Sequence, residues 1–375
     1  MSTQDATSPL AAEIRRQISQ RGPMPLAHYM SLCLTHPQHG YYMSRDPFGV
    51  SGDFTTSPEI SQMFGELIGL WGAAVWQATG NRSSVNLVEL GPGRGTLMAD
   101  ALRAAKIVPA FEQAISVHLV ERSPVLRDLQ RIKLSQFERA ITWHESVNDL
   151  PDGPAIIVAN EFFNALSVNQ AVRQADGWYE RTVTLDGNGD LMFGVGQHPL
   201  QNFEQTLPEQ VRAAPLGSVF EWRSHGVAFE LARRVKHGGA ALIIDYGHSR
   251  SDVGSTFQAL RNHRFDDPLS APGLADLTAH VDFAALADAA ASIGARVHGP
   301  VQQGAFLRAI GIDKRALGLK ARSPERSSEI DAALARLTAD GDSGMGQMFK
   351  ALALSDPKVT VLPGFTGGRS WATPE

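Results

Sequence analysis

The chain has 375 residues, of which 43% are apolar and 19% are charged, the composition of an ordinary globular protein with a large core. Its net charge of −5 argues against broad nucleic-acid binding, which needs a basic face. Cys33 is the single cysteine, which excludes an internal disulfide and a thiolate-rich metal site.

The first eighty residues are expected to be rich in helix. Residues 10–18 have an amphipathic helical pattern and are expected to pack on a domain surface. Residues 36–58 are punctuated by glycine and proline, which predicts a long loop or lid; Ser57 is expected to be the N-cap of the next helix, with Pro58 as its first residue. The apolar run 67–76 is about half the length of a bilayer span, so a core helix and no stable membrane insertion are predicted.

The N-terminal sequence lacks the apolar region of a secretory signal. Asp5 and Glu13 are also atypical of a transit peptide, which is poor in acidic residues. Together with a lone cysteine, which fits a reducing compartment, these features predict a cytoplasmic protein of bacterial type.

The most informative segment follows an apolar run at residues 85–88. It contains Glu89 and three alternate glycines, Gly91, Gly93 and Gly95, and it leads into a helical pattern. Glycine permits positive φ angles and lets a ligand touch the backbone. The segment is therefore predicted to be a ligand-binding turn between a strand and a helix.

A second apolar run at residues 117–120 ends in Glu121. A carboxylate at the end of the second strand is placed to accept hydrogen bonds from both hydroxyls of a ribose. The order of strand, glycine turn, helix, strand and acid predicts a nucleoside-binding α/β domain. The G-x-G-x-G spacing after an acid favours S-adenosyl-L-methionine (SAM), with S-adenosyl-L-homocysteine as product, over a dinucleotide.

The later segments complete an α/β pattern that contains an insertion. Continuous apolar runs predict buried strands at residues 140–143, 155–158 and 240–244. Alternating patterns separated by Asp-Gly and Asn-Gly turns predict antiparallel strands at residues 168–172, 178–185 and 191–195.

Helices are expected at residues 227–236 and 283–293, a loop at residues 247–280, and a last strand at residues 296–298. The predicted fold class is α/β, a class I methyltransferase (Rossmann-like) sheet with a helical N-terminal extension and an antiparallel β insertion. The expected segments are an N-terminal extension and lid (1–82), a SAM-binding half (83–160), a β-rich acceptor region (161–225) and a C-terminal half (226–375).

The fourth strand ends in Asn160 and Glu161, followed by two phenylalanines. Because the carboxyl ends of parallel strands line the ligand crevice, this pair is placed to hold a nitrogen nucleophile. A carboxylate orients a guanidinium bidentately and takes up the proton lost on methylation, so Glu161 is the candidate catalytic residue, with Asn160 beside it. The alternative is that Glu161 only braces the following loop.

Other residues are candidates for the acceptor side. Asp245 ends a strand near the crevice, where strand termination and acceptor contact are equal alternatives, and His280 precedes a helix. Tyr41 and Phe54 are expected to close over the site as parts of the lid. The histidines near the N-terminus have no acidic or thiolate partners clustered with them, so no metal site is expected.

Together these segments resemble the MidA family, whose mitochondrial member is an arginine methyltransferase that assists assembly of respiratory complex I. The resemblance covers nearly the whole chain and rests on HGYY at 39–42, GDFTTSPEIS at 52–61, ELGPGRGTL at 89–97, ERSP at 121–124, NEFFNAL at 160–166, DYG at 245–247 and the stretch 276–283. Asn164 stands where the family usually has an aspartate, so SAM binding carries over more directly than the identity of the acceptor.

The resemblance implies a SAM-dependent enzyme that symmetrically dimethylates an arginine in a protein substrate, such as a complex I subunit. No nucleic acid is expected as a partner, and a homodimer is compatible with the apolar segment and the β insertion. The alternatives are a methyltransferase of a small molecule or another protein side chain, and a SAM-binding assembly factor with little turnover. The glycine spacing disfavours a dinucleotide oxidoreductase.

Overall fold

The computed structural model describes residues 8–47, 55–341 and 344–365, and the chain divides into two compact units. The first unit combines the segment up to residue 54 with residues 164–224 and 250–282. The second unit combines residues 55–163, 225–249 and 283–375. This division differs from the four consecutive segments expected from the sequence, because packing joins segments that are distant along the chain.

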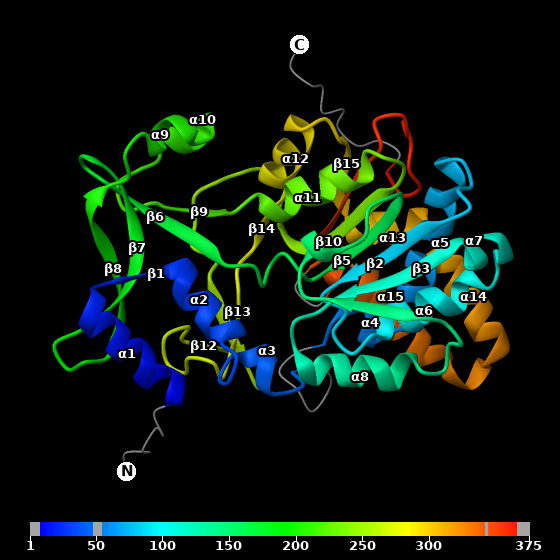
Figure 1. Ribbon diagram of the computed structural model, residues 1–375, viewed down its shortest axis with the longest axis horizontal. Coiled ribbons are helices and arrows are strands. Elements are labelled where there is room, and N and C mark those ends of the chain that lie inside the picture. The colour runs from blue at the N-terminus through cyan, green and yellow to red at the C-terminus, as the bar shows by residue number, and fades with distance from the viewer. Residues whose placement is uncertain (1–7, 48–54, 342–343, 366–375) are drawn as a thin grey trace. The chain divides into compact units, whose positions relative to one another are not determined.

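The second unit is built on one sheet. Its strands are β2 (Val85–Leu90), β3 (Ile115–Val120), β4 (Ile141–His144), β5 (Ala155–Asn160), β10 (Ala240–His248), β15 (Arg296–Gln302) and β16 (Phe349–Ser355). They lie in the order β15-β16-β10-β5-β2-β3-β4. Figure 1 labels the central strands β10, β5, β2 and β3 next to one another. The pairs from β10 to β4 are parallel, and β16 runs antiparallel to both of its neighbours. The predicted α/β sheet is confirmed.

β16 is the strand of this sheet that the sequence analysis missed, so the strand predicted at residues 296–298 is not the last one. β16 lies between β10 and β15, with Ala240 opposite Ser355 and Tyr246 opposite Phe349. The apolar runs that predicted the other buried strands contain β-branched residues, which favour strands. The apolar run of β16, residues 351–354, consists of alanine and leucine, which favour helix as local sequence.

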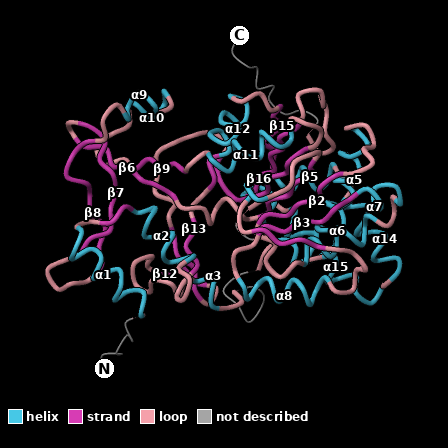
Figure 2. The backbone as a smooth tube through the Cα atoms, viewed as in Figure 1, coloured by secondary structure: helices cyan, strands magenta, loops and turns pink. Residues whose placement is uncertain are grey.

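Helices cover both faces of this sheet (Figures 1 and 2). One hydrophobic cluster joins the sheet to α5 (Gln62–Ala78), α6 (Thr96–Ala105), α13 (Gln303–Ala309) and α14 (Ile312–Arg322). Neighbouring residues of a strand face opposite ways, so Ile157 and Ile243, which lie outside that cluster, point to the other face. There α11 (Gly226–Val235) and α12 (Phe283–Ser292) pack against β10 and β16.

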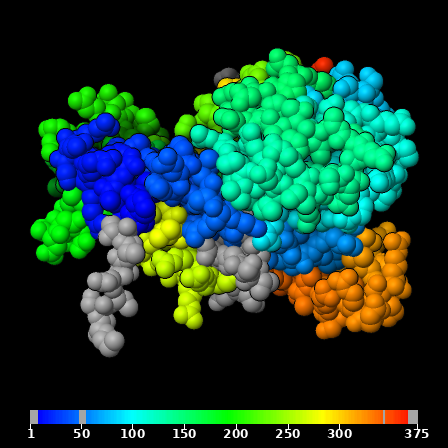
Figure 3. Space-filling model, turned by 60° about the horizontal axis from the view of Figure 1, so that its bottom comes forward, coloured from blue at the N-terminus to red at the C-terminus, as the bar shows by residue number. Residues whose placement is uncertain are grey.

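The remaining helical elements of the second unit are α4 (Ser57–Ile60), α7 (Pro109–Ala114), α8 (Pro124–Leu134), α15 (Ser327–Thr338), α16 (Met345–Met348), η1 (Val147–Asp149) and η2 (Pro324–Arg326). α14 and α15 lie side by side at the surface of this unit, orange in Figure 3. The helices predicted at residues 67–76, 227–236 and 283–293 are confirmed as α5, α11 and α12. None of the helices in the described ranges is long and apolar enough to cross a membrane.

The first unit contains two antiparallel sheets. The larger one consists of β1 (Met24–Pro25), β6 (Val168–Gln174), β7 (Gly177–Leu185), β8 (Leu191–Pro199) and β9 (Val219–Arg223). The smaller one consists of β11 (Gln258–Arg261), β12 (Arg264–Asp266) and β13 (Asp276–Thr278). The predicted antiparallel insertion is confirmed, and β1 pairs the N-terminal segment with β7.

The other elements of the first unit are α1 (Pro9–Arg21), α2 (Leu26–Thr35), α3 (Tyr41–Ser44), α9 (Phe203–Thr206), α10 (Glu209–Arg212) and β14 (Val281–Asp282). α1 is the predicted amphipathic helix, and it buries Leu10, Ile14 and Ile18 in a core that includes Tyr29 and Val183. These three residues recur every four positions, so they lie on one face of the helix, and this face packs into the core.

Two loop predictions were wrong. Residues 247–280 contain β11, β12 and β13, whose three or four residues each are too few to show an alternating pattern. Residues 36–58 contain α3 and the start of α4, and residues 48–54 of this stretch, with Phe54, lie outside the described residues.

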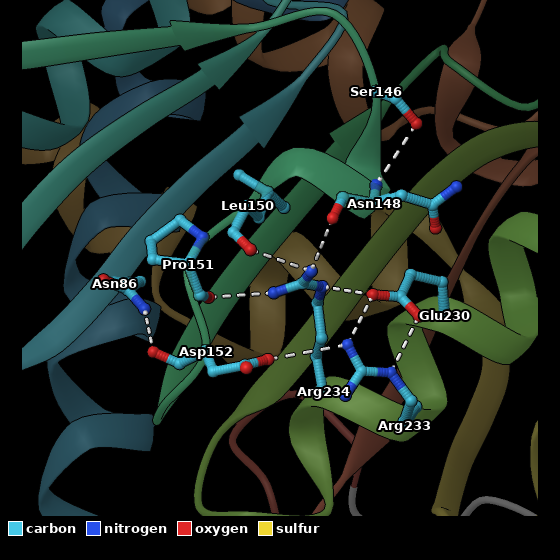
Figure 4. Close-up of polar contacts among 9 residues, drawn as sticks. All are labelled: Asn86, Ser146, Asn148, Leu150, Pro151, Asp152, Glu230, Arg233 and Arg234. Carbon is cyan, nitrogen blue, oxygen red and sulfur yellow. Dashed lines mark hydrogen bonds and ion pairs between the residues drawn. The ribbon is translucent and has the colours of Figure 1, made fainter.

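At the amino ends of the parallel strands, Arg234 of α11 holds the loop that precedes β5 (Figure 4). Its buried guanidinium donates hydrogen bonds to the carbonyls of Pro151 (2.9 Å) and Leu150 (3.0 Å). Glu230, one turn earlier, lies 2.6 Å from Arg234 Nε and 2.8 Å from Arg233 Nη2. This cluster anchors α11 to the sheet at the edge opposite the glycine turn.

We expect Arg234→Met to lower the free energy of unfolding by about 1–3 kcal/mol for each buried carbonyl that it leaves unpaired, because Pro151 and Leu150 lose their donor while Glu230 keeps Arg233. Chemical denaturation measures this loss. Arg233→Met is the matched control, since it removes the same charge from a half-exposed neighbour and should cost about 1 kcal/mol or less. Equal losses in the two variants would contradict a specific role for Arg234.

Candidate functional site

The turn between β2 and α6 contains Gly91, Gly93 and Gly95. Their φ angles are +61°, +53° and +80°, all in the left-handed region, which is the conformation that glycine was predicted to supply. A Cβ added to Gly91 would lie 3.0 Å from the ring of Phe162. α6 begins directly after Gly95, so its positive dipole end adjoins the turn.

Glu89 lies at the end of β2 and is buried. Burial raises the pKa of its carboxyl from the ordinary 4.5 to about 8, although a hydrogen bond from the backbone N–H of Met98, in the first turn of α6, acts in the opposite direction. Its Oε2 has no hydrogen-bond partner among the described residues. A buried oxygen of this kind is an acceptor suited to a ligand donor.

Glu121 follows the end of β3, and its carboxylate is held on both sides. Oε1 accepts a hydrogen bond from the N–H of Ser123 (2.8 Å), and Oε2 accepts one from Nε2 of Gln130 (3.3 Å). Burial raises the pKa of Glu121, and these hydrogen bonds oppose that rise. The carboxylate therefore has a fixed orientation at the carboxyl edge of the sheet.

Gln130 of α8 was not identified from the sequence. It is fully buried, donates to the carbonyl of Gly93 (2.7 Å) and accepts from the indole N–H of Trp143 (2.8 Å). A signal was present: Leu126, Gln130 and Leu134 are spaced four residues apart, which places the amide on the buried face of a helix. A polar residue on such a face needs partners and so indicates a site.

β5 ends at Asn160, opposite Ile244 of β10, whereas β10 continues to His248. The prediction that Asp245 ends its strand was wrong, because pairing with β16 extends β10 beyond the apolar run. Asn160 Nδ2 donates to Oε1 of Glu161 (3.3 Å). The buried carboxylate of Asp245 accepts hydrogen bonds from the N–H groups of Phe163 (3.0 Å) and Tyr246 (2.9 Å). These contacts brace the turn after β5, and a contact of Asp245 with the acceptor stays a prediction.

Glu161 has a φ of +51°, a left-handed conformation that costs a non-glycine residue about 1–2 kcal/mol. Its N–H donates to the carbonyl of Ile244 (2.8 Å), and its Oε1 accepts from the N–H of Ser57 (3.2 Å).

The prediction that Ser57 is an N-cap was wrong: Thr56 occupies that position of α4, and the side chain of Ser61 caps α5. Ser57 instead offers its backbone N–H to Glu161.

Tyr41 and His280 belong to the first unit. Tyr41 is buried, with the guanidinium of Arg45 4.4 Å from its ring centre. The carbonyl of His280 accepts a hydrogen bond from Arg223 (2.7 Å). The roles expected for these two residues, and for Phe54 outside the described ranges, stay predictions.

Within the second unit, the glycine turn and the three acids Glu89, Glu121 and Glu161 lie at the carboxyl ends of β2, β3 and β5, which are adjacent in the sheet. Asn160 Oδ1, like Glu89 Oε2, is buried and has no hydrogen-bond partner in the described parts of the chain. These acceptors fit a ligand that carries ammonium and hydroxyl donors. Among the described residues, no group of three or more His, Cys, Asp or Glu is placed to hold a metal ion.

Comparison with known proteins identifies relatives over most of the chain. Residues 67–301 match a family model described as S-adenosyl-L-methionine-dependent methyltransferase. Protein arginine methyltransferase NDUFAF7, mitochondrial, is 40% identical in Danio rerio (80% of this chain, 76% of the relative) and 37% identical in Homo sapiens (86% and 78%). The Drosophila melanogaster homologue is 39% identical (92% and 84%).

Two solved structures from Burkholderia thailandensis also match, each at 28% identity over 98% of both chains. One is a methyltransferase-type protein bound to S-adenosyl-homocysteine, with a TM-score of 0.86. The other is the native protein of the same superfamily, with a TM-score of 0.82. The predicted methyltransferase fold is thus confirmed by similarity as well as by strand order.

The predicted cytoplasmic, bacterial-type location was wrong by this comparison. The curated relatives are named as mitochondrial proteins in Drosophila melanogaster, Danio rerio and Homo sapiens. The prediction rested on targeting features that the sequence lacks, and the absence of a feature does not assign a compartment.

Glu89→Gln should remove a pH-dependent loss of stability in the ligand-free protein. Because burial raises the pKa of Glu89 to about 8, the folded state binds this proton more tightly than the unfolded state does. The stabilisation is complete below pH 4.5 and is lost as the pH rises towards 8, by on the order of 4 kcal/mol.

Denaturation curves collected from pH 5 to pH 8 measure this slope. The variant should have a flatter profile, while Glu145→Gln, at an exposed carboxylate of the same unit, should keep the wild-type profile. A wild-type slope in Glu89→Gln would show that Glu89 ionises normally.

Proposed function

Because the chain belongs to the MidA family of SAM-dependent methyltransferases, we propose that it transfers the methyl group of SAM to an arginine side chain of a protein. The enzyme class and the cofactor follow from the family, and the arginine acceptor follows the names of the curated relatives. The observation that carries the proposal is the fixed carboxylate of Glu161 at the carboxyl end of β5, beside the glycine turn.

The residues that would hold the cofactor lie at the ends of β2 and β3. The backbone of Gly91, Gly93 and Gly95 would approach the methionine end, and Glu89 offers a buried acceptor for its ammonium. Glu121 would accept the ribose hydroxyls. When bound, SAM supplies a methyl group activated by its sulfonium, so the protein mainly positions the acceptor and excludes water.

Glu161 would orient the acceptor guanidinium. Its Oε1 is fixed by Ser57 and by Asn160, so the carboxylate cannot rotate freely. A planar guanidinium donates to such a carboxylate bidentately. Methyl transfer would form an N–C bond and break the S–C bond of SAM, and Glu161 would take up the proton that the attacking nitrogen loses.

The finer acceptor assignment is symmetric dimethylation of an arginine in a respiratory complex I subunit or a similar protein. It rests on the family resemblance, which covers nearly the whole chain. The homodimer also stays a prediction, which the oligomeric state in solution tests.

Gly93→Val should abolish binding of SAM and S-adenosyl-L-homocysteine while the chain stays folded. A β-branched side chain at a φ of +53° costs about 1–3 kcal/mol, which a domain of this size tolerates. The same side chain covers the backbone that the cofactor approaches. Calorimetric titration measures the binding, and affinity within a few fold of wild type would show that the glycine turn is not the cofactor site.

Glu161→Gln should keep the affinity for S-adenosyl-L-homocysteine within a few fold and lower kcat by about 10²–10⁴. The glutamine amide retains an oxygen for Ser57 and Asn160. It lacks the negative charge that pairs with a cation, and it does not take up a proton. Methyl transfer to an arginine peptide measures kcat, with Glu145→Gln as the exposed control. Unchanged turnover would remove Glu161 from the mechanism.

A further inference from the structure

We propose that Gln130 is a positioning residue that sets the Glu121 carboxylate for a ribose and thereby makes the site prefer a ribonucleoside over its 2′-deoxy counterpart. The inference rests on the proposed ribose role of Glu121. It adds a residue to which neither the sequence motifs nor the family resemblance assigns a role.

The orientation of the Gln130 amide is set by Trp143. An indole N–H is a donor only, so the amide atom 2.8 Å from it must be the acceptor oxygen. The NH₂ group therefore points the other way, where the two acceptors lie. The reversed amide does not satisfy these partners. Its NH₂ group would face the indole N–H of Trp143, and its oxygen would face the carboxylate of Glu121.

The NH₂ group connects two parts of the proposed cofactor site. It donates to the carbonyl of Gly93 (2.7 Å) in the glycine turn and to Oε2 of Glu121 (3.3 Å). Glu121 Oε1 is held separately by the N–H of Ser123 (2.8 Å). Ser123 and Gln130 donate to different oxygens, and a backbone hydrogen bond from Arg122 adds to them, so the plane of the carboxylate is fixed.

A purely structural role would not need this arrangement. Gln130 lies between Leu126 and Leu134 on the buried face of α8, where leucine would fill the space without the cost of burying an amide. Gly95 also packs on Gln130, since a Cβ added there would lie 3.5 Å from its Cγ. The fully buried amide contacts both the glycine turn and Glu121. Holding these two parts of the site in place relative to each other explains why an amide is buried here.

The expected consequence is a preference that depends on the ribose hydroxyls. A rigid carboxylate gains most from a ligand that presents both hydroxyls and leaves an acceptor unsatisfied when one is missing. If the carboxylate rotates freely, the difference between the affinities for the ribose ligand and for the 2′-deoxy ligand becomes smaller. Gln130 therefore affects the ratio of two affinities rather than affinity alone.

The test is calorimetric titration of the full chain with S-adenosyl-L-homocysteine and with its 2′-deoxy analogue. We expect the wild type to bind the ribose form about tenfold more tightly. Glu121→Ala should bring this ratio close to one. Gln130→Leu should lower the ratio to about threefold or less, and the double variant should match Glu121→Ala, because Gln130 acts through Glu121.

Gln303→Leu is the matched control. Gln303 is another fully buried glutamine of the second unit, and it donates to the carbonyl of Leu337 (3.0 Å), which no proposed role involves. It should lower stability and leave the ratio at the wild-type value. Trp143→Phe provides a second test that keeps Gln130 but removes the donor that orients it, and it should also lower the ratio.

The outcomes separate this proposal from the function on which it rests. A wild-type ratio in Glu121→Ala would overturn the ribose role of Glu121 and the proposal with it. A lowered ratio in Glu121→Ala, together with wild-type ratios in Gln130→Leu and Trp143→Phe, would overturn the positioning role alone. In that case both ligands would be weakened equally, as expected of a residue that only braces the core.

Discussion

The site of the second unit depends on one backbone constraint, the left-handed turn between β2 and α6. Gly91, Gly93 and Gly95 have φ angles of +61°, +53° and +80°, a series that L-residues with side chains rarely adopt. The turn stops the strand, starts the helix and leaves backbone open to a ligand. It also places the carbonyl of Gly93 where Gln130 reaches it, so the conformation of the turn and the position of Glu121 are linked through one amide.

Three glutamates lie near this turn, and each has a different environment. Glu89 is enclosed by the sheet and α6, so burial dominates and raises its pKa to about 8. Glu121 is also buried, but hydrogen bonds from Ser123 and Gln130 stabilise its charge. Glu161 is held by the Ser57 N–H and by Asn160 in a strained backbone conformation. Burial thus favours the neutral form of the first, whereas hydrogen bonds hold the carboxylates of the second and the third in place.

The polar side chains at the two ends of the parallel strands make different kinds of contact. At the amino ends, Arg234 is buried against the carbonyls of Leu150 and Pro151, an arrangement that stabilises the loop before β5. At the carboxyl ends, Glu89 and Asn160 retain buried oxygens without partners among the described residues. At one end a guanidinium binds backbone carbonyls, whereas at the other end buried acceptors remain available for a donor from outside the described residues.

The sequence by itself determined the parallel strands, the glycine turn and the acids at the strand ends, because these follow from local patterns: continuous apolar runs, G-x-G-x-G spacing and a carboxylate after a strand. It also determined the family, through motifs spread along the chain. Tertiary structure decided the rest. β16 enters the sheet by antiparallel pairing with β10, residues 250–282 join the N-terminal segment and the insertion in one unit, and Gln130 meets Gly93 and Glu121 across the fold. Each of these depends on contacts between residues far apart in sequence, which no local periodicity records.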